Sequence, residues 1–483
     1  MGCLRCVFFF AFRNCDSSVL GVYFSTMCAS FLIRSHFRST LSKNAVLRRD
    51  ITERQSHIII RLLRTCVNVR KRGYIHSVGQ YHNTGFRFNF YNSFSLSTRA
   101  LTKLKVVLGI ETSCDDTGAA IVNEHGHIIA EELHSQTATH NETGGIIPNV
   151  AKDLHTQNVE TVVQRTLESA NMRLQDLDAI AVTVKPGLIM SLRVGLHHAQ
   201  KLAHMSNLQL IPIHHMEAHA LTARMIGRID FPFLVLLASG GHCLLAIARD
   251  IDDFLLLGTS LDTAPGEAYD KTARELNLIK MPQFCGMSGG AAIEHMAKYG
   301  DHMAFPRLHV MAQSASCNFS FTGIKMATRR QILAEYSKSG LPPDELLPNV
   351  ADICAWFQYN VIYHLARRLQ RAFIFVENAE LIGDIKTLVV SGGVASNSYI
   401  RANLQHICSL YNYTLVCPPQ KLCTDNGIMI AWNGIEKMLS GRNYLQSADS
   451  LDVVARAPFG VDISKSVTNT SIKLSKLKLL GEK

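Results

Sequence analysis

Two histidines four residues apart, His215 and His219, have the spacing in this chain that most directly predicts chemistry. If their segment is helical, both imidazoles project from one face and can bind a single metal ion. Glu217 would lie about 200° around the helix from His215 and so face away. Zinc peptidases of the H-E-x-x-H type need glutamate directly after the first histidine, so the spacing argues against that class. Taken alone, the pair is equally compatible with a helix that carries two histidines and no metal.

Two turns of small residues could bind phosphate oxygens. Residues 112–118 form one turn, and residues 239–242, with the sequence Ser-Gly-Gly-His, form the other. Bare backbone N–H groups that converge in such turns hold anions, although each turn could also be only a tight hairpin. The chain has no G-x-x-x-x-G-K-[ST] motif and no G-x-G-x-x-G after a strand, which argues against P-loop and Rossmann nucleotide sites.

The elements that must position these residues follow the same order twice. The first series has strands at 105–110, 118–122 and 127–133, a helix from 148, a strand at 178–184, a helix at 191–207, a strand at 208–213 and the histidine helix. The second has strands at 232–238, 243–248 and 254–259, helices from 266 and 288, an irregular insertion at 301–348, a long helix, a strand at 386–391, a helix from 396, a strand at 414–416 and a helix from 426. This repetition predicts two mixed-sheet α/β lobes with a cleft between them.

The positive charge of the chain is concentrated in its first hundred residues. Residues 1–100 hold 15 of the 49 Lys and Arg but only three of the 39 acids, so the rest of the chain is close to neutral. This segment is rich in Arg, Ser and Phe, and its apolar run from Val7 ends at Arg13, too early for a secretory signal. We therefore expect residues 1–100 to be a transit segment for import into the mitochondrial matrix, mostly disordered and outside the fold. No apolar run approaches the ~18 residues of a membrane span, so no membrane association is expected.

Eight segments, in order along the chain, resemble one protein family. They are 109–115, 185–188, the histidine helix, 239–242, 266–271, 319–325, 391–397 and 423–426. Over about residues 105–440 the chain is similar to tRNA N6-adenosine threonylcarbamoyltransferases of the TsaD type, in their mitochondrial branch. The resemblance implies an α/β fold of the actin-like, Hsp70-like (ASKHA) class, with two duplicated ribonuclease-H-type lobes. We expect lobe I at 104–227, joined by a helix from about 426–440, lobe II at 231–425 with the insertion at 301–348, and a C-terminal tail at 441–483.

The resemblance also implies the residues of the site. His215, His219 and the distant Asp425 are implied as ligands of one divalent ion, Fe or Zn, with coordination positions left open for catalysis. Without the resemblance, Asp425 could equally be the N-cap of the helix near Asn426. The implied substrate contacts are Leu237, Ala238, Ser239, Gly240, Gly241, Asp270, Gly290 and Asn397. From the residues alone, Asp270 beside Lys271 could equally be a surface ion pair.

The implied reaction acylates the exocyclic amine of an adenine. That amine is a poor nucleophile, so the donor must carry a good leaving group. The resemblance implies threonylcarbamoyl-AMP as co-substrate, made by a separate threonylcarbamoyl-AMP synthase. The acceptor is the adenosine 3′ of the anticodon in mitochondrial tRNAs that read codons beginning with adenine. Asp115 is the candidate general base or amine-orienting group, although it could simply cap its turn. Cys114 as a covalent nucleophile is the alternative.

Further expectations concern partners and competing functions. An anticodon loop is already unpaired, so its recognition can rest on shape and phosphate contacts. Candidate contacts are Lys325, Arg329, Arg330, Arg367, Arg368, Arg371 and the lysine-rich stretch after Ser464. The resemblance implies a homodimer. The competing functions are a metallopeptidase that acts on glycoproteins and a nucleotide-binding regulator without group transfer.

Overall fold

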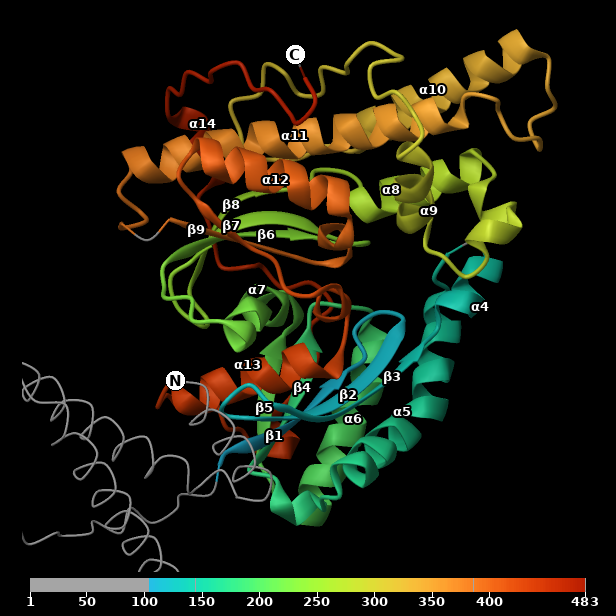
Figure 1. Cartoon of the computed structure of the whole chain (residues 1–483). Helices are drawn as coiled ribbons and strands as arrows, with labels where there is room; N and C mark the ends of the chain where they lie inside the picture. Colours follow the sequence, from blue (N-terminus) through green and yellow to red (C-terminus); the bar gives the residue numbers. More distant parts are fainter. Residues whose placement is uncertain (1–103, 144, 385, 483) are drawn as a thin grey trace, which may run out of the picture. The chain divides into compact units, whose positions relative to one another are not determined.

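The computed structural model describes residues 104–482, apart from residues 144 and 385 (Figure 1). The expected transit segment, residues 1–100, lies outside the described residues. Residues 104–482 form two lobes, each built on one mixed β-sheet. No helix in this described part is long and apolar enough to cross a membrane.

The lobe I sheet has five strands in the order β3-β2-β1-β4-β5. Their bounds are β1 (Val106–Glu111), β2 (Asp116–Asn123), β3 (Ile128–Ser135), β4 (Ala179–Lys185) and β5 (Leu210–His214). β1 pairs antiparallel with β2 and parallel with β4, and β4 pairs parallel with β5. Alternate residues of β1 therefore point to opposite faces, and both faces are covered by helices.

The lobe II sheet has six strands in the order β10-β9-β6-β7-β8-β11. Their bounds are β6 (Phe233–Ala238), β7 (Cys243–Ala248), β8 (Phe254–Thr259), β9 (Thr387–Ser391), β10 (Thr414–Val416) and β11 (Val461–Asp462). β6 pairs antiparallel with β7 and parallel with β9, as β1 pairs with β2 and β4 in lobe I. Apart from β11, the two sheets share one strand order. The duplicated ribonuclease-H-type fold of the actin-like class is thus confirmed.

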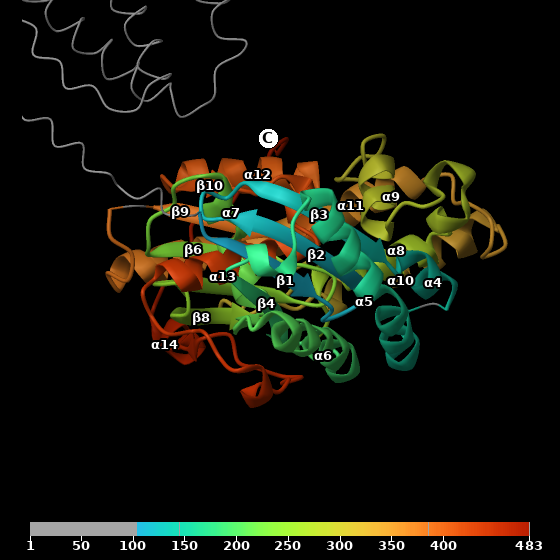
Figure 2. The ribbon, with the colours of Figure 1, turned by 90° about the horizontal axis from the view of Figure 1, so that it is seen from below.

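Helices cover both faces of the lobe I sheet. On one face lie α5 (Pro148–Ala170) and α6 (Ile189–Ser206), seen from below in Figure 2. On the other lie α7 (His215–Ile226) and α13 (Gly427–Leu439). α13 follows β10 of lobe II in sequence, yet its Ile428, Ile430 and Ile435 share a core with Val107 of β1. The chain therefore returns to lobe I before β11 completes the lobe II sheet.

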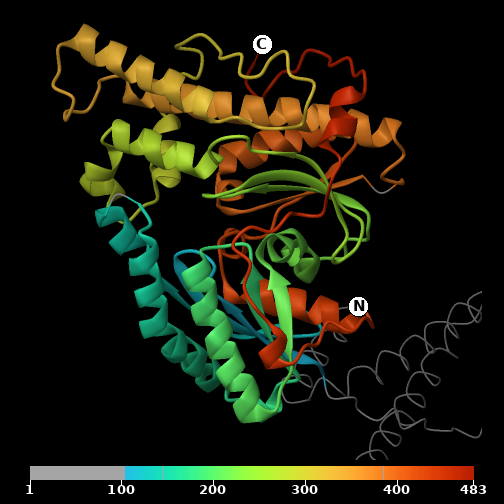
Figure 3. The same ribbon diagram turned by 180° about the vertical axis from the view of Figure 1, so that it is seen from behind.

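Helix α7 lies between the two lobes, as Figures 1 and 3 both show. Ala218 on one side packs into the core behind the lobe I sheet. Met216, Ala220 and Leu221 on the other side pack with Phe233 and its neighbours on the lobe II sheet. Because both of its faces are buried, α7 is fixed in place, and so are the histidines it carries.

Lobe II contains the largest core, where its helices cover the sheet face away from α7. These helices are α8 (Pro265–Glu275), α9 (Gly289–Ala297), α10 (Thr322–Ser339), α11 (Val350–Asn378) and α12 (Ser398–Leu410). The remaining described helices are α4 (Thr137–Glu142), α14 (Ser464–Asn469) and the short 3-10 turns η1 (Leu174–Asp176), η2 (Leu278–Lys280), η3 (Pro282–Phe284), η4 (Gly393–Ser396), η5 (Gln420–Leu422) and η6 (Ala448–Ser450).

Two segments are more ordered than the sequence interpretation expected. The irregular insertion at 301–348 contains α10, whose buried residues Ile324, Thr328, Ile332 and Tyr336 recur every four positions. That stripe is a helical signal, but charged residues between its members obscured it. Residues 441–482, expected as a tail, fold back on both lobes because their apolar residues pack into the cores. Those residues include Val453 in lobe I and Val467, Leu477 and Leu479 in lobe II.

Candidate active site

Three metal-ligand candidates meet where α7 and the start of α13 face each other. The Nε2 atom of His219 lies 3.0 Å from Oδ1 of Asp425, and Nε2 of His215 lies 3.5 Å from the same oxygen. One ligand atom from each residue lies within 4.8 Å of the others. Asn426, not Asp425, caps α13, because its Oδ1 accepts a hydrogen bond from the Met429 N–H at 2.9 Å. The N-cap alternative for Asp425 is therefore wrong, and its carboxylate faces the imidazoles.

The spacing of these atoms fits a divalent transition metal. Bonds of about 2.0–2.1 Å in a tetrahedral arrangement place neighbouring ligand atoms about 3.3 Å apart. The separations of Asp425 from the two imidazoles, 3.0 and 3.5 Å, lie on either side of that value, and the two imidazole nitrogens lie within 4.8 Å of each other. Two nitrogens and one oxygen suit Zn or Fe(II), and three protein ligands leave positions open for a substrate.

Glu111 orients His215, a role that the sequence interpretation missed. This carboxylate is fully buried at the end of β1, and its Oε2 lies 3.2 Å from Nδ1 of His215. Thr183 donates to the same oxygen at 2.6 Å, and the Ser113 N–H donates to the other at 2.5 Å. Such a partner on the far nitrogen fixes the ring so that Nε2 faces Asp425. The available signal was an acid at the end of an apolar strand, because a fully buried carboxylate needs a partner.

Charges dominate this small buried cluster. Burial alone would lower the pKa of His215, but the carboxylates of Asp425 and Glu111 outweigh it and raise this pKa to about 9. Burial likewise opposes ionisation of Asp425, yet the positive charge of the two histidines holds its pKa far below the usual range. Without a metal ion, the cluster is therefore stabilised as an ion pair. A metal cation would replace the imidazolium charge.

Glu217 has a separate structural role. It pairs with Lys437 of α13 at 3.2 Å, and Lys437 also donates to the Pro212 carbonyl at 3.2 Å. Both side chains are largely buried. Glu217 thus faces away from the imidazoles, as the helical spacing predicted.

The first turn, which holds the candidate base Asp115, is braced by hydrogen bonds from several elements. His155 of α5 contacts Thr117 Oγ1 at 2.7 Å through Nδ1 and the Cys114 carbonyl at 3.0 Å through Nε2. The Asp115 carbonyl accepts from the Gln136 N–H at 3.1 Å. The side chain of Asp115 is half-buried, and its charge adds a small effect to the burial that raises the pKa of Asp270 in lobe II. Burial raises the pKa of the Cys114 thiol well above its usual value, which disfavours a thiolate nucleophile.

The second turn brings a stretch of implied substrate contacts to the same junction. Leu237 and Ala238 end β6, and the Ser239 N–H donates to the His242 carbonyl at 2.8 Å to close the turn. Gly240 and Gly241 are exposed, and their N–H groups donate to no residue in the described part of the chain. His242, at the end of this turn, interacts electrostatically with His215, His219 and Asp425, so the turn belongs to the same junction.

The other implied substrate contacts lie on neighbouring loops of lobe II. Burial raises the pKa of Asp270, although the N–H groups of Gly289 and Gly290 donate to its carboxylate. Lys271 pairs with Glu267 at 2.5 Å, so the alternative of a surface ion pair between Asp270 and Lys271 is not found among the described residues. Asn397 caps α12 by accepting from the Ile400 N–H at 3.0 Å, and its Nδ2 donates to Gln358. The structure thus brings Asp270 and Gly290 together, while Asn397 also has a capping role.

Two of the candidate tRNA contacts are too buried for that role. Arg368 and Arg371 are 4% and 7% exposed. Arg329 and Arg330 on α10 are exposed and remain available to a polyanion. Arg368 and Arg371 are buried because of the segments that pack around α11, and the sequence alone could not reveal that packing.

The comparisons with known proteins identify the family. Residues 127–432 match the family model described as TsaD, tRNA N6-adenosine threonylcarbamoyltransferase. The chain belongs to this family. A Mus musculus protein named mitochondrial tRNA N6-adenosine threonylcarbamoyltransferase is 48% identical over 81% of this chain and 95% of its own length. An Agrobacterium fabrum protein named tRNA N6-adenosine threonylcarbamoyltransferase is 41% identical over 74% of this chain and 94% of its own length.

These matches confirm the predicted family and the predicted mitochondrial location. They also confirm the transferase function and not the alternative of a metallopeptidase. Among solved structures, HypF from T. kodakarensis aligns with a TM-score of 0.45 at 14% identity, over 72% of this chain and 49% of that one. The fold assignment rests on the shared strand order of the two sheets.

Proposed function

We propose that this member of the tRNA N6-adenosine threonylcarbamoyltransferase family is metal-dependent and takes its acyl group from threonylcarbamoyl-AMP. The observation that carries the proposal is the approach of Asp425 to within 3.0 and 3.5 Å of two imidazoles from a helix 206 residues away in sequence. His215, His219 and Asp425 would hold one divalent ion, Fe or Zn. When bound, the ion supplies positive charge that anchors the donor and stabilises negative charge on its oxygens.

The residues around the ligand cluster can bind and orient both substrates. The free N–H groups of Gly240 and Gly241 are suited to the phosphate oxygens of the donor. Leu237, Ala238, Ser239, Asp270, Gly290 and Asn397 would contact the rest of it. The adenine N6 amine attacks the carbamoyl carbon, the new C–N bond forms, and the bond to the phosphate oxygen breaks to release AMP. Asp115, half-buried in the first turn, would accept the proton that N6 loses.

The partners are proposed on the same basis. The anticodon loop of a tRNA would approach the junction of the lobes and contact exposed cations such as Arg329 and Arg330. The donor is a mixed anhydride made by a separate enzyme, so we propose a threonylcarbamoyl-AMP synthase in the same compartment, the mitochondrial matrix. Exposed apolar residues along the sheet edge β3, among them Ile128, Ile129 and Leu133, support a homodimer. Light scattering of the purified protein would measure its oligomeric state.

A reconstitution with matched histidine variants tests the metal dependence. The protein is incubated with unmodified tRNA, threonine, bicarbonate, ATP and the synthase, and the tRNA nucleosides are then analysed by mass. The variant H219A should lose both bound metal, measured by elemental analysis, and threonylcarbamoyladenosine formation. The control H204A removes an imidazole that is 58% exposed on α6 and should retain both. Full modification by a metal-free H219A protein would refute the proposal.

A further inference from the structure

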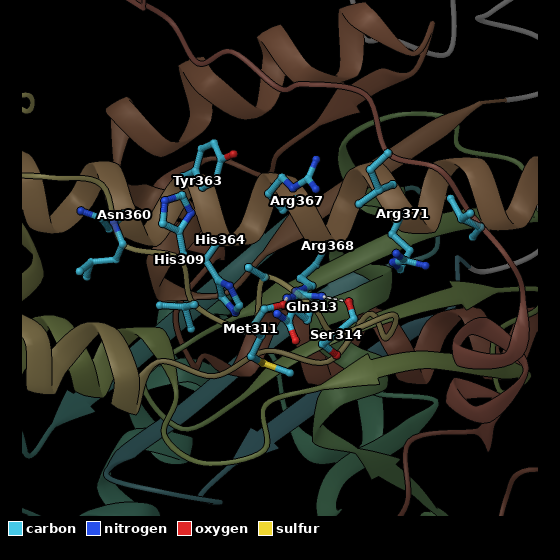
Figure 4. Close-up of a pocket in the computed structure, with 15 residues that line it drawn as sticks. His309, Met311, Gln313, Ser314, Asn360, Tyr363, His364, Arg367, Arg368 and Arg371 are labelled. Atoms are coloured by element: carbon cyan, nitrogen blue, oxygen red, sulfur yellow. Dashed lines mark hydrogen bonds between the residues drawn. The ribbon is translucent and has the colours of Figure 1, made fainter.

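A polar cavity of about 300 Å³ lies in lobe II, apart from the residues of the candidate active site. It is bounded by α11, by the segment 308–314 and by the C-terminal segment at Ile472 and Leu474 (Figure 4). None of its lining residues belongs to the metal-ligand cluster, to the two turns or to the implied contacts with the donor. Of the three lining arginines that were candidate tRNA contacts, Arg368 and Arg371 are too buried for that role, so the established reaction leaves the interior of this cavity without a function.

Three arginines of α11 line this cavity, namely Arg367, Arg368 and Arg371, and no acidic residue does. Arg368 and Arg371 are 4% and 7% exposed, so both cations are removed from bulk water. No carboxylate of the described residues lies within 4 Å of a guanidinium nitrogen of these three arginines. A buried charge without a counter-charge is costly, and proteins normally pair it.

The hydrogen bonds of these arginines compensate the charge only in part. Arg368 donates to the carbonyls of Met311, Ser314 and Ser316 at 2.7 to 3.1 Å, but its Nε has no partner among the described residues. Arg371 is less satisfied, because its buried Nε and Nη1 both lack a partner there. Figure 4 shows Arg368 and Arg371 extending from α11 toward the side where Ser314 lies. The arginines of the cavity thus carry several N–H groups without a hydrogen-bond acceptor among the described residues, together with an excess of positive charge.

Electrostatics within the cluster agree with this geometry. Burial, together with the positive charge of Arg371 and Arg367, lowers the pKa of Arg368 to about 10. Burial and the charge of Arg368 similarly lower the pKa of His364, another lining residue, to about 3. The cations therefore repel one another, and a bound anion would relieve that repulsion.

We propose that this arginine-lined cavity is a binding site for a small phosphate-bearing anion. Guanidinium groups match phosphate oxygens in geometry, and two or three of them balance a dianion. A cavity of about 300 Å³ accepts a small molecule of this kind. The backbone of a polynucleotide can reach only exposed side chains, so the burial of Arg368 and Arg371 favours a small ligand over tRNA.

Arg371 is the informative residue to change. Arg368 holds three carbonyls of the loop 311–316, so its loss would disturb the fold, whereas Arg371 makes no hydrogen bond among the described residues. The full-length protein and its variant Arg371→Gln are titrated with inorganic phosphate, pyrophosphate and ribose 5-phosphate, by calorimetry and by thermal unfolding. Arg173→Gln, which removes an arginine that is 80% exposed in lobe I, is the matched control.

We expect phosphate or ribose 5-phosphate to bind the wild-type protein and to raise its Tm. Arg371→Gln should weaken the Kd at least about tenfold, yet unfold at the same or a higher temperature without ligand, because it removes an unpaired buried charge. Arg173→Gln should behave as wild type. Tighter binding of ribose 5-phosphate than of phosphate would assign a phosphate ester as the ligand, and the reverse order would assign the free anion.

Three outcomes would overturn the proposal. One is the absence of binding by any of the probes, and another is equal binding by the wild type and Arg371→Gln. The third is a lower Tm of Arg371→Gln with an unchanged response to phosphate, which would make Arg371 purely structural. As an independent measurement on the wild type, phosphate should slow hydrogen exchange in residues 310–316, and unchanged exchange would contradict the site. None of these readouts depends on tRNA modification.

Discussion

Replacing Gly427 with alanine should test how α13 places Asp425 beside the histidines. Gly427 is the first residue of α13 and packs against the middle of β2. A Cβ atom at this position would lie 2.4 Å from the carbonyl carbon of Ala119 and 2.5 Å from the backbone nitrogen of Ala120. Favourable contacts between such atoms lie at about 3.5–4.0 Å, so the start of α13 or β2 must move by about 1 Å.

Two measurable effects follow from that displacement. Overpacking against rigid backbone costs about 1–3 kcal/mol of the free energy of unfolding, which lowers Tm by roughly 1–4 °C in a protein of this size. Asp425 lies two residues before Gly427, and metal sites tolerate shifts of only about 0.2 Å in their ligands. We therefore expect the metal affinity to fall about 10- to 100-fold, which is the usual effect of removing a residue that orients a metal ligand.

Scanning calorimetry measures the Tm, and competition with a chromogenic chelator measures the affinity for Zn²⁺. Gly227→Ala is the matched control, since Gly227 follows α7 with a φ of −166° and its Cβ would meet no atom within 4 Å. That variant should unfold and bind metal as the wild type does. If Gly427→Ala also kept the wild-type Tm and metal affinity, the close contact with β2 would not position Asp425.

Three further predictions concern single side chains near the site. Glu217→Gln should lower the free energy of unfolding by about 1–3 kcal/mol, because Lys437 stays buried with a weaker partner. The rate of tRNA modification per folded protein molecule should stay within about twofold of the wild type. A loss of activity beyond about 100-fold would instead indicate a catalytic role for Glu217. Cys114→Ser should retain activity in the nucleoside assay because burial keeps the thiol protonated, and an inactive but folded serine variant would support covalent catalysis. Burial raises the pKa of Asp116 to about 7 in the folded protein. Between about pH 4 and pH 7 this carboxyl is therefore protonated in the folded state but ionised in the unfolded state. The free energy of unfolding then decreases as the pH rises from about 4 to about 7. Asp116→Asn should remove this loss, so that its Tm advantage over the wild type grows from pH 4 to pH 7; an advantage that is constant with pH would contradict the assignment.

The sequence by itself determined the features that depend on local periodicity. Alternation and apolar runs identified the strands of both lobes except β11, which fell in the expected tail, and the repeated order of the strands predicted the duplicated fold. The four-residue spacing of His215 and His219 placed both imidazoles on one face of α7, and the same geometry placed Glu217 away from them. These inferences succeed because neighbours along a helix or strand have fixed relative directions whatever the rest of the chain does.

Only the tertiary structure decided which distant residues meet and which charges are buried. Spacing could not join Asp425 to histidines 206 residues away, and the family resemblance had to supply that link. Glu111 became an orienting partner of His215 only once β1 and α7 were packed together. The sequence made Arg371 a candidate contact for tRNA, but the segments that cover α11 enclose it. Contacts across the fold depend on how whole elements pack, and a local pattern does not contain that information.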